Sequence, residues 1–276
     1  MLLTGIALLA AVFSVAAVMA GELSPALTPV LFIAFSLGLL LLSVGYLWLI
    51  CAFVDQDKPR EEDSPFYRRM MHLYIEALIT LVGLKVEVSG LEKTPKSGRF
   101  LLVCNHQNES DPGILLHYFK NSQLAFISKQ ENRDMFAVGK IMHMTLCQLM
   151  NRENDREALK TILRCIQILK EDKASIAVFP EGGIKDKDKL SPFRSGVFKM
   201  AQKANVPIVV CTLKGTSEVF HNIAKLRPSH VRLHLLDVIP AESLKGRTTV
   251  DIAQQVYDMM LADLGPEYAL DGAENT

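Results

Sequence analysis

Hydrophobic and polar positions are unevenly distributed along the chain. Residues 1–21 contain no charged side chain, and after Glu22 a second uncharged stretch runs from Leu23 to Val54. A helix needs about 20 mostly apolar residues to cross the roughly 30 Å hydrocarbon core of a bilayer. The second stretch exceeds this length, whereas the first reaches it only marginally. The pattern predicts an N-terminal hydrophobic helical hairpin over residues 1–54 that inserts into a membrane lipid bilayer. The alternative is that the chain crosses the bilayer once and not twice.

A cleaved signal peptide is the alternative interpretation of the first stretch. Such peptides carry Lys or Arg before the apolar run, and the first four residues here contain neither. Four basic residues lie between positions 58 and 69, whereas the turn at Ser24-Pro25 carries none. Because basic residues accumulate on the cytosolic side of a membrane, we expect the chain beyond Val54 to lie on the cytosolic face.

Residues 55–81 are predicted to form a polar, proline-containing linker followed by a helix. The helical part, from Phe66 to Ile75, is apolar with basic residues at one end. Two interpretations remain open. The helix lies in the membrane interface, or it is the first core helix of the following domain.

From residue 82 to residue 269, short apolar runs alternate with helical patterns. Strands are predicted at Lys85–Val88, Phe100–Cys104, Leu124–Ser128, Ser175–Phe179, Pro207–Leu213 and Val231–Val238. Helices are predicted near 112–120, 134–144, 154–172, 194–204 and 249–264. Alternating strands and helices indicate one α/β domain with a central sheet flanked by helices. The polar residues 270–276 are predicted to be a flexible tail.

Charge and cysteine usage exclude several classes of protein. The chain has 30 Lys+Arg and 30 Asp+Glu, so it lacks the strongly basic face that a nucleic-acid partner requires. Its five cysteines are odd in number, widely spaced and without a CxxC pair. We therefore expect a reducing compartment, with neither a disulfide framework nor a zinc ribbon.

The loop after the predicted strand Phe100–Cys104 contains His106 and, five residues later, Asp111. A neutral imidazole, with an unperturbed pKa near 6.5, is a suitable general base for an attacking hydroxyl. A carboxylate beside it would fix its tautomer and stabilise the imidazolium. The alternative is that Asp111, which precedes Pro112, only caps a helix, and that His106 is only a turn residue.

A second loop follows the predicted strand Ser175–Phe179 and reads Phe-Pro-Glu-Gly-Gly. Glycines such as Gly182 and Gly183 permit tight turns and let the backbone approach a ligand. Glu181 is expected to accept hydrogen bonds from substrate hydroxyls. An ordinary strand-to-loop turn is the alternative interpretation.

These segments resemble the motifs of the glycerolipid acyltransferases typified by lysophosphatidic acid acyltransferase. Asn105-His106 through Asp111 is similar to the first family motif, and Phe179 through Gly182 is similar to the Phe-Pro-Glu-Gly motif. Met150-Asn151-Arg152 and Val206-Pro207-Ile208-Val209 resemble the other two, in the same order. The resemblance implies an α/β fold, membrane association, and an acyl-CoA or acyl-carrier-protein donor, with no metal and no cofactor beyond that co-substrate.

The resemblance also implies roles for individual residues. His106 is the general base and Asp111 its partner. Glu181, Gly182 and Gly183 hold the acceptor. Lys129, Arg152 and Lys185 lie near the acceptor phosphate.

One position departs from the family pattern. Where the family continues Glu-Gly-Thr-Arg-Ser, this chain has Ile184 in place of the phosphate-binding Arg. Ile cannot make a bidentate phosphate contact. Lys185, Lys187 and Arg194 are candidates for compensating this loss. The alternative is an acceptor that carries another head group.

The predicted reaction is acyl transfer to the hydroxyl of a lysophospholipid, with 1-acylglycerol-3-phosphate as the expected acceptor. A serine hydrolase is disfavoured because the chain has no Gly-x-Ser-x-Gly segment. A non-catalytic membrane lipid-binding protein remains the other alternative. Acyl chain length and oligomeric state do not follow from these residues.

Overall fold

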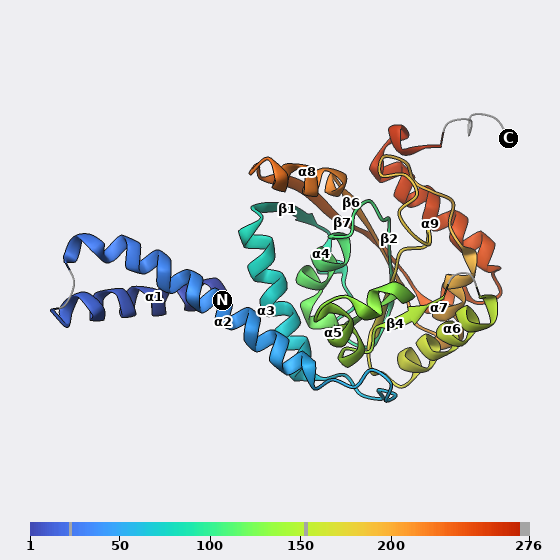
Figure 1. Ribbon diagram of the computed structural model, residues 1–276. Helices are drawn as coiled ribbons and strands as arrows, with labels where there is room; N and C mark the ends of the chain where they lie inside the picture. The colour runs from blue at the N-terminus through green and yellow to red at the C-terminus, as the bar shows by residue number, and fades with distance from the viewer. Residues whose placement is uncertain (22–23, 152–153, 271–276) are drawn as a thin grey trace.

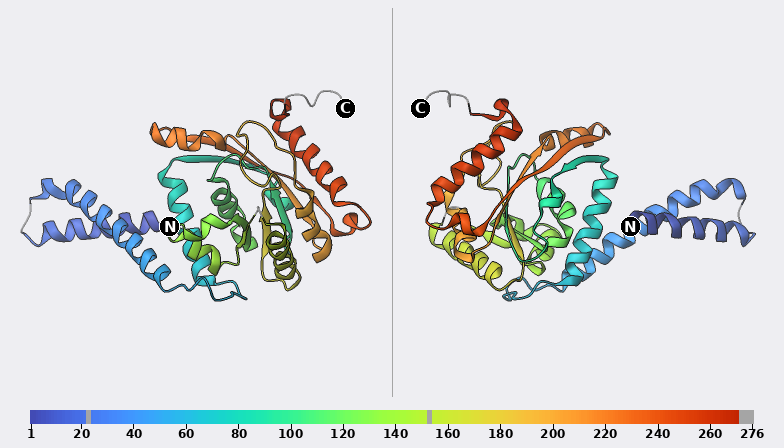
Figure 2. Two further views of the ribbon diagram at one scale, coloured as in Figure 1. Left: turned by 45° about the vertical axis from the view of Figure 1, so that its right-hand side comes forward. Right: turned by 180° about the vertical axis from the view of Figure 1, so that it is seen from behind.

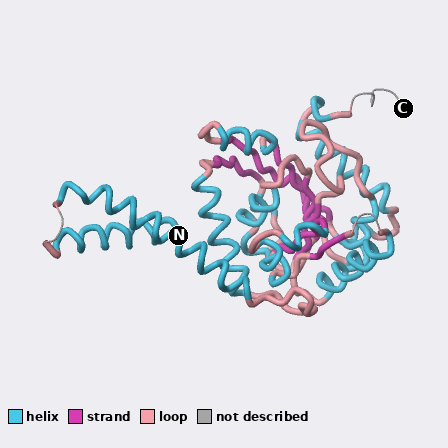
Figure 3. Tube along the Cα trace, viewed as in Figure 1, coloured by secondary structure: helices cyan, strands magenta, loops and turns pink. Residues whose placement is uncertain are grey.

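The computed structural model describes residues 1–21, 24–151 and 154–270 (Figure 1). A seven-stranded sheet lies at its centre, with strand order β1-β7-β6-β2-β5-β3-β4 (Figure 3). The strands are β1 Leu84–Ser89, β2 Leu101–Cys104, β3 Leu124–Lys129, β4 Gln148–Met150, β5 Ser175–Val178, β6 Ile208–Lys214 and β7 Ser229–Ile239.

The five strands from β6 through β2, β5 and β3 to β4 run parallel to one another. Their carboxyl ends therefore meet along one side of the sheet, which we call the carboxyl edge. Strand β7 pairs antiparallel with β6, and β1 runs parallel to β7. Ligands of parallel α/β sheets bind outside the carboxyl ends of the strands, so this edge is where a site is expected.

Both faces of the sheet are covered by helices (Figure 2). Along β2, Leu101 and Val103 enter one apolar core, whereas Leu102 and Cys104 enter the other, because successive side chains of a strand point to opposite faces. The first core is covered by α6 Asp155–Lys170, α7 Lys199–Ala204 and α9 Thr249–Leu264. The second is covered by α3 Pro65–Leu81, α4 Asp111–Tyr118, α5 Val138–Met144 and α8 Val219–Ala224.

Capping residues set where the two longest domain helices of the first face begin. The Asn154 side chain accepts hydrogen bonds from the backbone N–H groups of Arg156 and Glu157, so α6 starts at Asp155. At α9, Thr248 and Asp251 form a capping box in which each side chain accepts the other's backbone N–H. These caps satisfy backbone donors that have no partner within the helix.

All six predicted strands are present, with bounds that differ by at most two residues. The α/β prediction, with a central sheet flanked by helices, is therefore confirmed. Strand β4 and helix α8 were not predicted, because three and six residues are too short to show a periodicity.

Two helix predictions were too long. The predicted helix 134–144 is α-helical only from Val138, because Ala137 adopts a φ of 51° that interrupts the helix. The preceding residues Gln130–Asp134 form a 3₁₀-helix, η4. The predicted helix 194–204 begins as a 3₁₀-helix, η5 Ser195–Phe198, and continues as α7.

Helix α3 packs against the domain through Met71 and Ala77 and contacts α4, α5 and β1. Of the two interpretations of this helix, the packing supports the core helix. A buried ion pair secures its first turn. The Arg68 guanidinium bonds the Asp63 carboxylate at 2.7 Å and also donates to backbone carbonyls of Leu124 and Thr145. The linker is thereby held to the start of β3 and the end of α5.

The N-terminal hairpin projects from the domain (Figure 1). It consists of α1 Leu2–Met19, a 3₁₀ turn η1 Pro25–Leu27 and α2 Thr28–Ala52. At 1.5 Å per residue, α2 spans about 38 Å and α1 about 27 Å. Both are long and apolar enough to cross a membrane, and most of their apolar side chains are exposed. Helices that are apolar all round are stable when surrounded by lipid or protein, so the hairpin is consistent with membrane association.

Candidate active site

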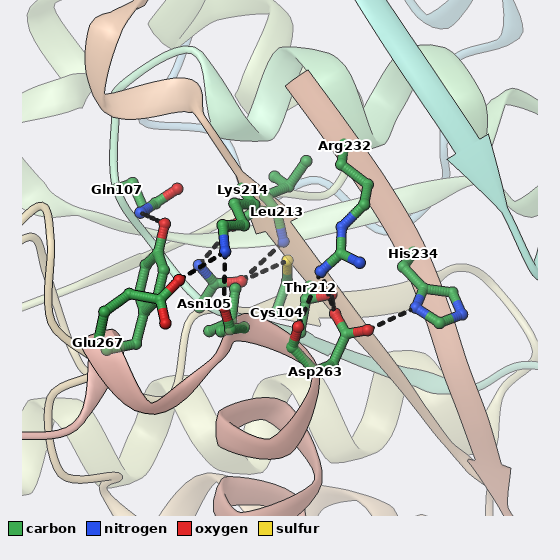
Figure 4. A network of polar contacts seen from close by, with 12 residues as sticks. Cys104, Asn105, Gln107, Thr212, Leu213, Lys214, Arg232, His234, Asp263 and Glu267 are labelled. Atoms are coloured by element: carbon green, nitrogen blue, oxygen red, sulfur yellow. Dashed lines mark hydrogen bonds and ion pairs between the residues drawn. The ribbon is translucent and has the colours of Figure 1, made fainter. Parts of the chain in front are cut away.

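The loop after β2 begins with Asn105, whose side chain is anchored to the neighbouring strand β6 (Figure 4). Its Nδ2 donates to the Leu213 carbonyl and its Oδ1 accepts the Leu213 N–H, both at 2.8 Å. The amide side chain thus bonds β6 as another strand residue would. This pairing fixes the backbone from which His106 departs at the carboxyl edge.

His106 and Asp111 lie together. The Nδ1 atom of His106 is 2.9 Å from Oδ2 of Asp111, and this same oxygen accepts the backbone N–H groups of Gln107 and Asn108 at 2.7 and 2.9 Å. An ionised carboxylate only accepts hydrogen bonds, so Nδ1 carries the proton and Nε2 is the basic nitrogen. Nε2 has no hydrogen-bond partner among the described residues, and the side chain is 15% exposed.

The alternative interpretation, that Asp111 only caps a helix, is not supported by the structure. Helix α4 begins at Asp111 itself, the preceding Ser110 makes no capping bond, and Pro112 follows within the first turn. The Asp111 carboxylate turns back to the loop, because the amides of Gln107 and Asn108 and the imidazole offer three donors there. The side chain is fully buried, and its Oδ1 has no partner in the described part of the chain.

The plane of the His106 ring is set by stacking on Phe179. The ring centroids are 4.0 Å apart and the planes differ by 11°. Phe179 in turn stacks on Phe126 of β3, with centroids 5.7 Å apart. The negative face of an aromatic ring attracts a cation, so this arrangement also favours the imidazolium that forms when Nε2 takes a proton.

Glu181 joins the two motif loops. Its Oε1 accepts the backbone N–H of His106 at 2.7 Å, and its Oε2 accepts the backbone N–H of Ser191 at 2.9 Å. The side chain is buried, and burial raises the pKa of Glu181 to about 7, against the opposing effect of these bonds and of nearby His106. In this structure both oxygens of the buried carboxylate bond backbone amides, so Glu181 positions the backbone of His106. Its role as an acceptor for substrate hydroxyls stays a prediction.

Gly182 and Gly183 have φ values of 79° and 142°, a region that residues with a Cβ rarely adopt. Arg194 lies directly over the first of them. A Cβ at Gly182 would come within 2.6 Å of the Arg194 Nε atom, and the Arg194 N–H bonds the Pro180 carbonyl at 2.8 Å. The guanidinium of an exposed arginine is thus held beside the loop that carries Glu181.

The other predicted site residues are placed as follows. Lys129 ends β3 at the carboxyl edge and is exposed, and Lys185 is exposed in the loop after β5. Arg152 lies outside the described residues. A polar surface pocket of about 700 Å³ lies elsewhere, between linker residues such as Asp57 and η4, and His106 does not line it.

Several supporting residues were not assigned roles from the sequence. Buried Gln107 bonds the carbonyl of Lys187, and more weakly the hydroxyls of Tyr268 and Thr216. It therefore joins the catalytic loop to segments 80 and 161 residues further along the chain. Asn105 and Phe179 belong to the two sequence motifs. Their positions next to His106 and near Glu181 were the only indication in the sequence that they support the site.

We expect Glu181→Gln to change the pH dependence of stability. Because the pKa is raised from 4.5 to about 7, the folded protein binds this proton more tightly than the unfolded chain does. The contribution to the free energy of unfolding is therefore full at pH 4.5 and falls as the pH rises to 7, by about 1–3 kcal/mol. Melting of both proteins in detergent, followed by circular dichroism, should show a fall of Tm over this range that is steeper in the unsubstituted protein. Parallel curves would contradict the assignment.

The chain was compared with known proteins. The family model "Acyltransferase" matches residues 85–214. A probable 1-acyl-sn-glycerol-3-phosphate acyltransferase of Mycoplasma pneumoniae is 30% identical over 200 residues, which cover 70% of this chain and 74% of that protein. A chloroplastic 1-acyl-sn-glycerol-3-phosphate acyltransferase of Brassica napus is 32% identical over 158 residues, 55% of this chain. The match spans 45% of that relative's own length.

A solved structure has the same fold. The crystal structure of the 1-acyl-sn-glycerophosphate (LPA) acyltransferase PlsC from Thermotoga maritima aligns with a TM-score of 0.62 at 21% identity, covering 80% of this chain and 86% of that one. The matched family region contains both motif loops and strands β2 to β6 of the sheet. With its matched relatives and its fold, the chain belongs to the 1-acyl-sn-glycerol-3-phosphate acyltransferase family.

Proposed function

We propose that this protein transfers a fatty acyl group from acyl-CoA or acyl-carrier protein to the free hydroxyl of 1-acyl-sn-glycerol 3-phosphate, giving phosphatidic acid. The observation that carries the proposal is the 2.9 Å contact between His106 Nδ1 and Asp111 Oδ2, which leaves Nε2 as the basic nitrogen at the carboxyl edge. The similarity to 1-acyl-sn-glycerol-3-phosphate acyltransferases supports this acceptor.

The reaction proceeds by direct transfer. His106 Nε2 removes the proton of the acceptor hydroxyl as its oxygen attacks the thioester carbonyl. The Asp111 carboxylate and the face of Phe179 stabilise the imidazolium. The tetrahedral intermediate then breaks its carbon–sulfur bond, and the departing thiolate takes the proton from the imidazolium. Because the thioester is already activated, no residue has to form a covalent intermediate.

Arg194 holds the acceptor phosphate in place of the arginine that Ile184 replaces. Its guanidinium lies over Gly182, one residue from Glu181, which bonds the His106 backbone. No acidic partner of Arg194 is found in the described residues, so its charge is available to an anion. Exposed Lys185 and Lys129, from the same edge, add positive charge.

The catalytic domain lies on the cytosolic face of the membrane. The amino group of Met1 contacts Glu76 on α3, so both ends of the hairpin lie on the side of the domain. The basic residues between positions 58 and 69 follow α2 directly, as expected for the cytosolic side.

The reaction is tested by incubating the purified protein in detergent with radiolabelled acyl-CoA and a panel of lysolipids. We expect the fastest product formation with the phosphate monoester acceptor. His106→Ala should lower kcat/KM by about 10²–10⁴, because the base is lost. His234→Ala is a matched control, since His234 forms a similar 2.8 Å pair with Asp263 on β7 and α9. A preference for lysophosphatidylcholine, or equal losses in both variants, would contradict the proposal.

We expect Arg194→Gln to raise KM for 1-acylglycerol 3-phosphate. A hydrogen bond to a charged group contributes about 1.5–3 kcal/mol, which corresponds to a roughly 10- to 100-fold change. Lys203→Gln is the control. It removes an exposed positive charge near the end of α7, which precedes β6 and therefore lies at the opposite edge of the sheet. This variant should leave KM unchanged. Equal KM values in the three proteins would place the phosphate elsewhere.

A further inference from the structure

Three large apolar side chains are exposed in a short segment between η4 and α5. Met135 is 50% exposed, Phe136 57% and Val138 44%. Phe53, directly after the end of α2, is 82% exposed. We call Met135, Phe136 and Val138 the 135–138 patch. Exposed apolar side chains that are contiguous mark contact surfaces, whereas single ones do not.

The patch is bound to the place where the chain leaves the apolar helix α2. The Cys51 Sγ atom contacts the Ala137 carbonyl, and Lys140 Nζ donates to the Val54 carbonyl at 2.9 Å. On the same segment, Gln56 donates to the Arg133 carbonyl at 3.2 Å, and the Arg133 guanidinium pairs with Asp57. Contacts made by residues before and after the patch thus hold it beside the end of α2.

The backbone of the patch lies close against η4. Ala137 adopts a φ of 51° and is itself buried. At Gly139, a Cβ would lie 1.9 Å from the Arg133 carbonyl oxygen, which shows how closely η4 approaches the start of α5. The backbone on both sides of Val138 is thus closely fitted, whereas the three apolar side chains remain outside.

The patch also adjoins the carboxyl edge. The chain enters η4 directly from Lys129, the last residue of β3, and only β5 lies between β3 and β2 in the sheet. Because β2 leads to His106, the patch and the imidazole belong to the same side of the sheet. A lipid held at the patch is therefore on the side of the domain from which His106 is reached.

From these observations we infer that the 135–138 patch, with Phe53, is a second membrane-contacting surface that inserts into the lipid interface beside the end of α2. The occupant is the bilayer, because the patch is bonded to the end of a helix most of whose apolar side chains are exposed. Bulky apolar side chains of this kind enter the boundary between head groups and acyl chains. The surface would keep the carboxyl edge next to the membrane that supplies the acceptor. This consequence rests on the proposed function, whereas membrane contact by the patch does not.

Insertion is tested with a single tryptophan reporter in the full chain. Trp48 is the only tryptophan, so Trp48→Phe provides the background. Phe136→Trp then places the reporter in the patch, with Met135→Trp as a second position if the first does not fold. Val250→Trp, at an exposed position of α9 across the domain from the hairpin, is the control (Figure 2). Each protein is reconstituted in vesicles of phosphatidylcholine and phosphatidylglycerol.

We expect the patch reporter to lose most of its emission when the vesicles contain lipids brominated high in the acyl chains, and to resist quenching by acrylamide in the water. The Val250→Trp reporter should show the reverse. The measurement needs no turnover, so its failure is distinct from failure of the proposed reaction. A patch reporter that acrylamide quenches as strongly as the control, without quenching by brominated lipid, would overturn the inference.

Discussion

One buried carboxylate oxygen determines the geometry of the site. Oδ2 of Asp111 accepts two backbone N–H groups of its own loop and the Nδ1 proton of His106. Hydrogen bonds to a buried charge are strong, and losing one is costly because water does not replace it. The position of the loop and the tautomer of the ring are therefore set by the same atom. Asn105 and Glu181 hold the backbone on either side of this contact, and Phe179 sets the plane of the ring.

The parts of the fold that were predictable are those with a local signal. The helical spacing of apolar residues identified α6, and continuous apolar runs identified β2 and β5. The geometry of the site was harder to predict from the sequence, because its supporting contacts join residues far apart in the chain. Asn105 bonds a residue 108 positions later, and Glu181 bonds back over 75 positions. No spacing rule indicates such contacts, so the bond from Glu181 to the His106 backbone was not predicted.

The apolar hairpin and the candidate site are connected through the sheet. The end of α2 is bonded to the segment around Arg133 and Lys140, which follows β3, while the Arg68–Asp63 pair holds the linker to the start of β3. The end of the hairpin and the linker that follows it are therefore attached to opposite ends of β3, which is two positions from β2 in the sheet.

The central claim is that His106 and Asp111 act as one unit. The most direct measurement is a double-mutant cycle of kcat/KM with His106→Ala, Asp111→Asn and the double variant, assayed in one detergent with one acyl-CoA and one lysophosphatidic acid. Residues that act together are not additive, so the double variant should lose no more than about threefold beyond His106→Ala alone. Losses that multiply, so that the double variant falls by the product of the two single effects, would contradict the pairing.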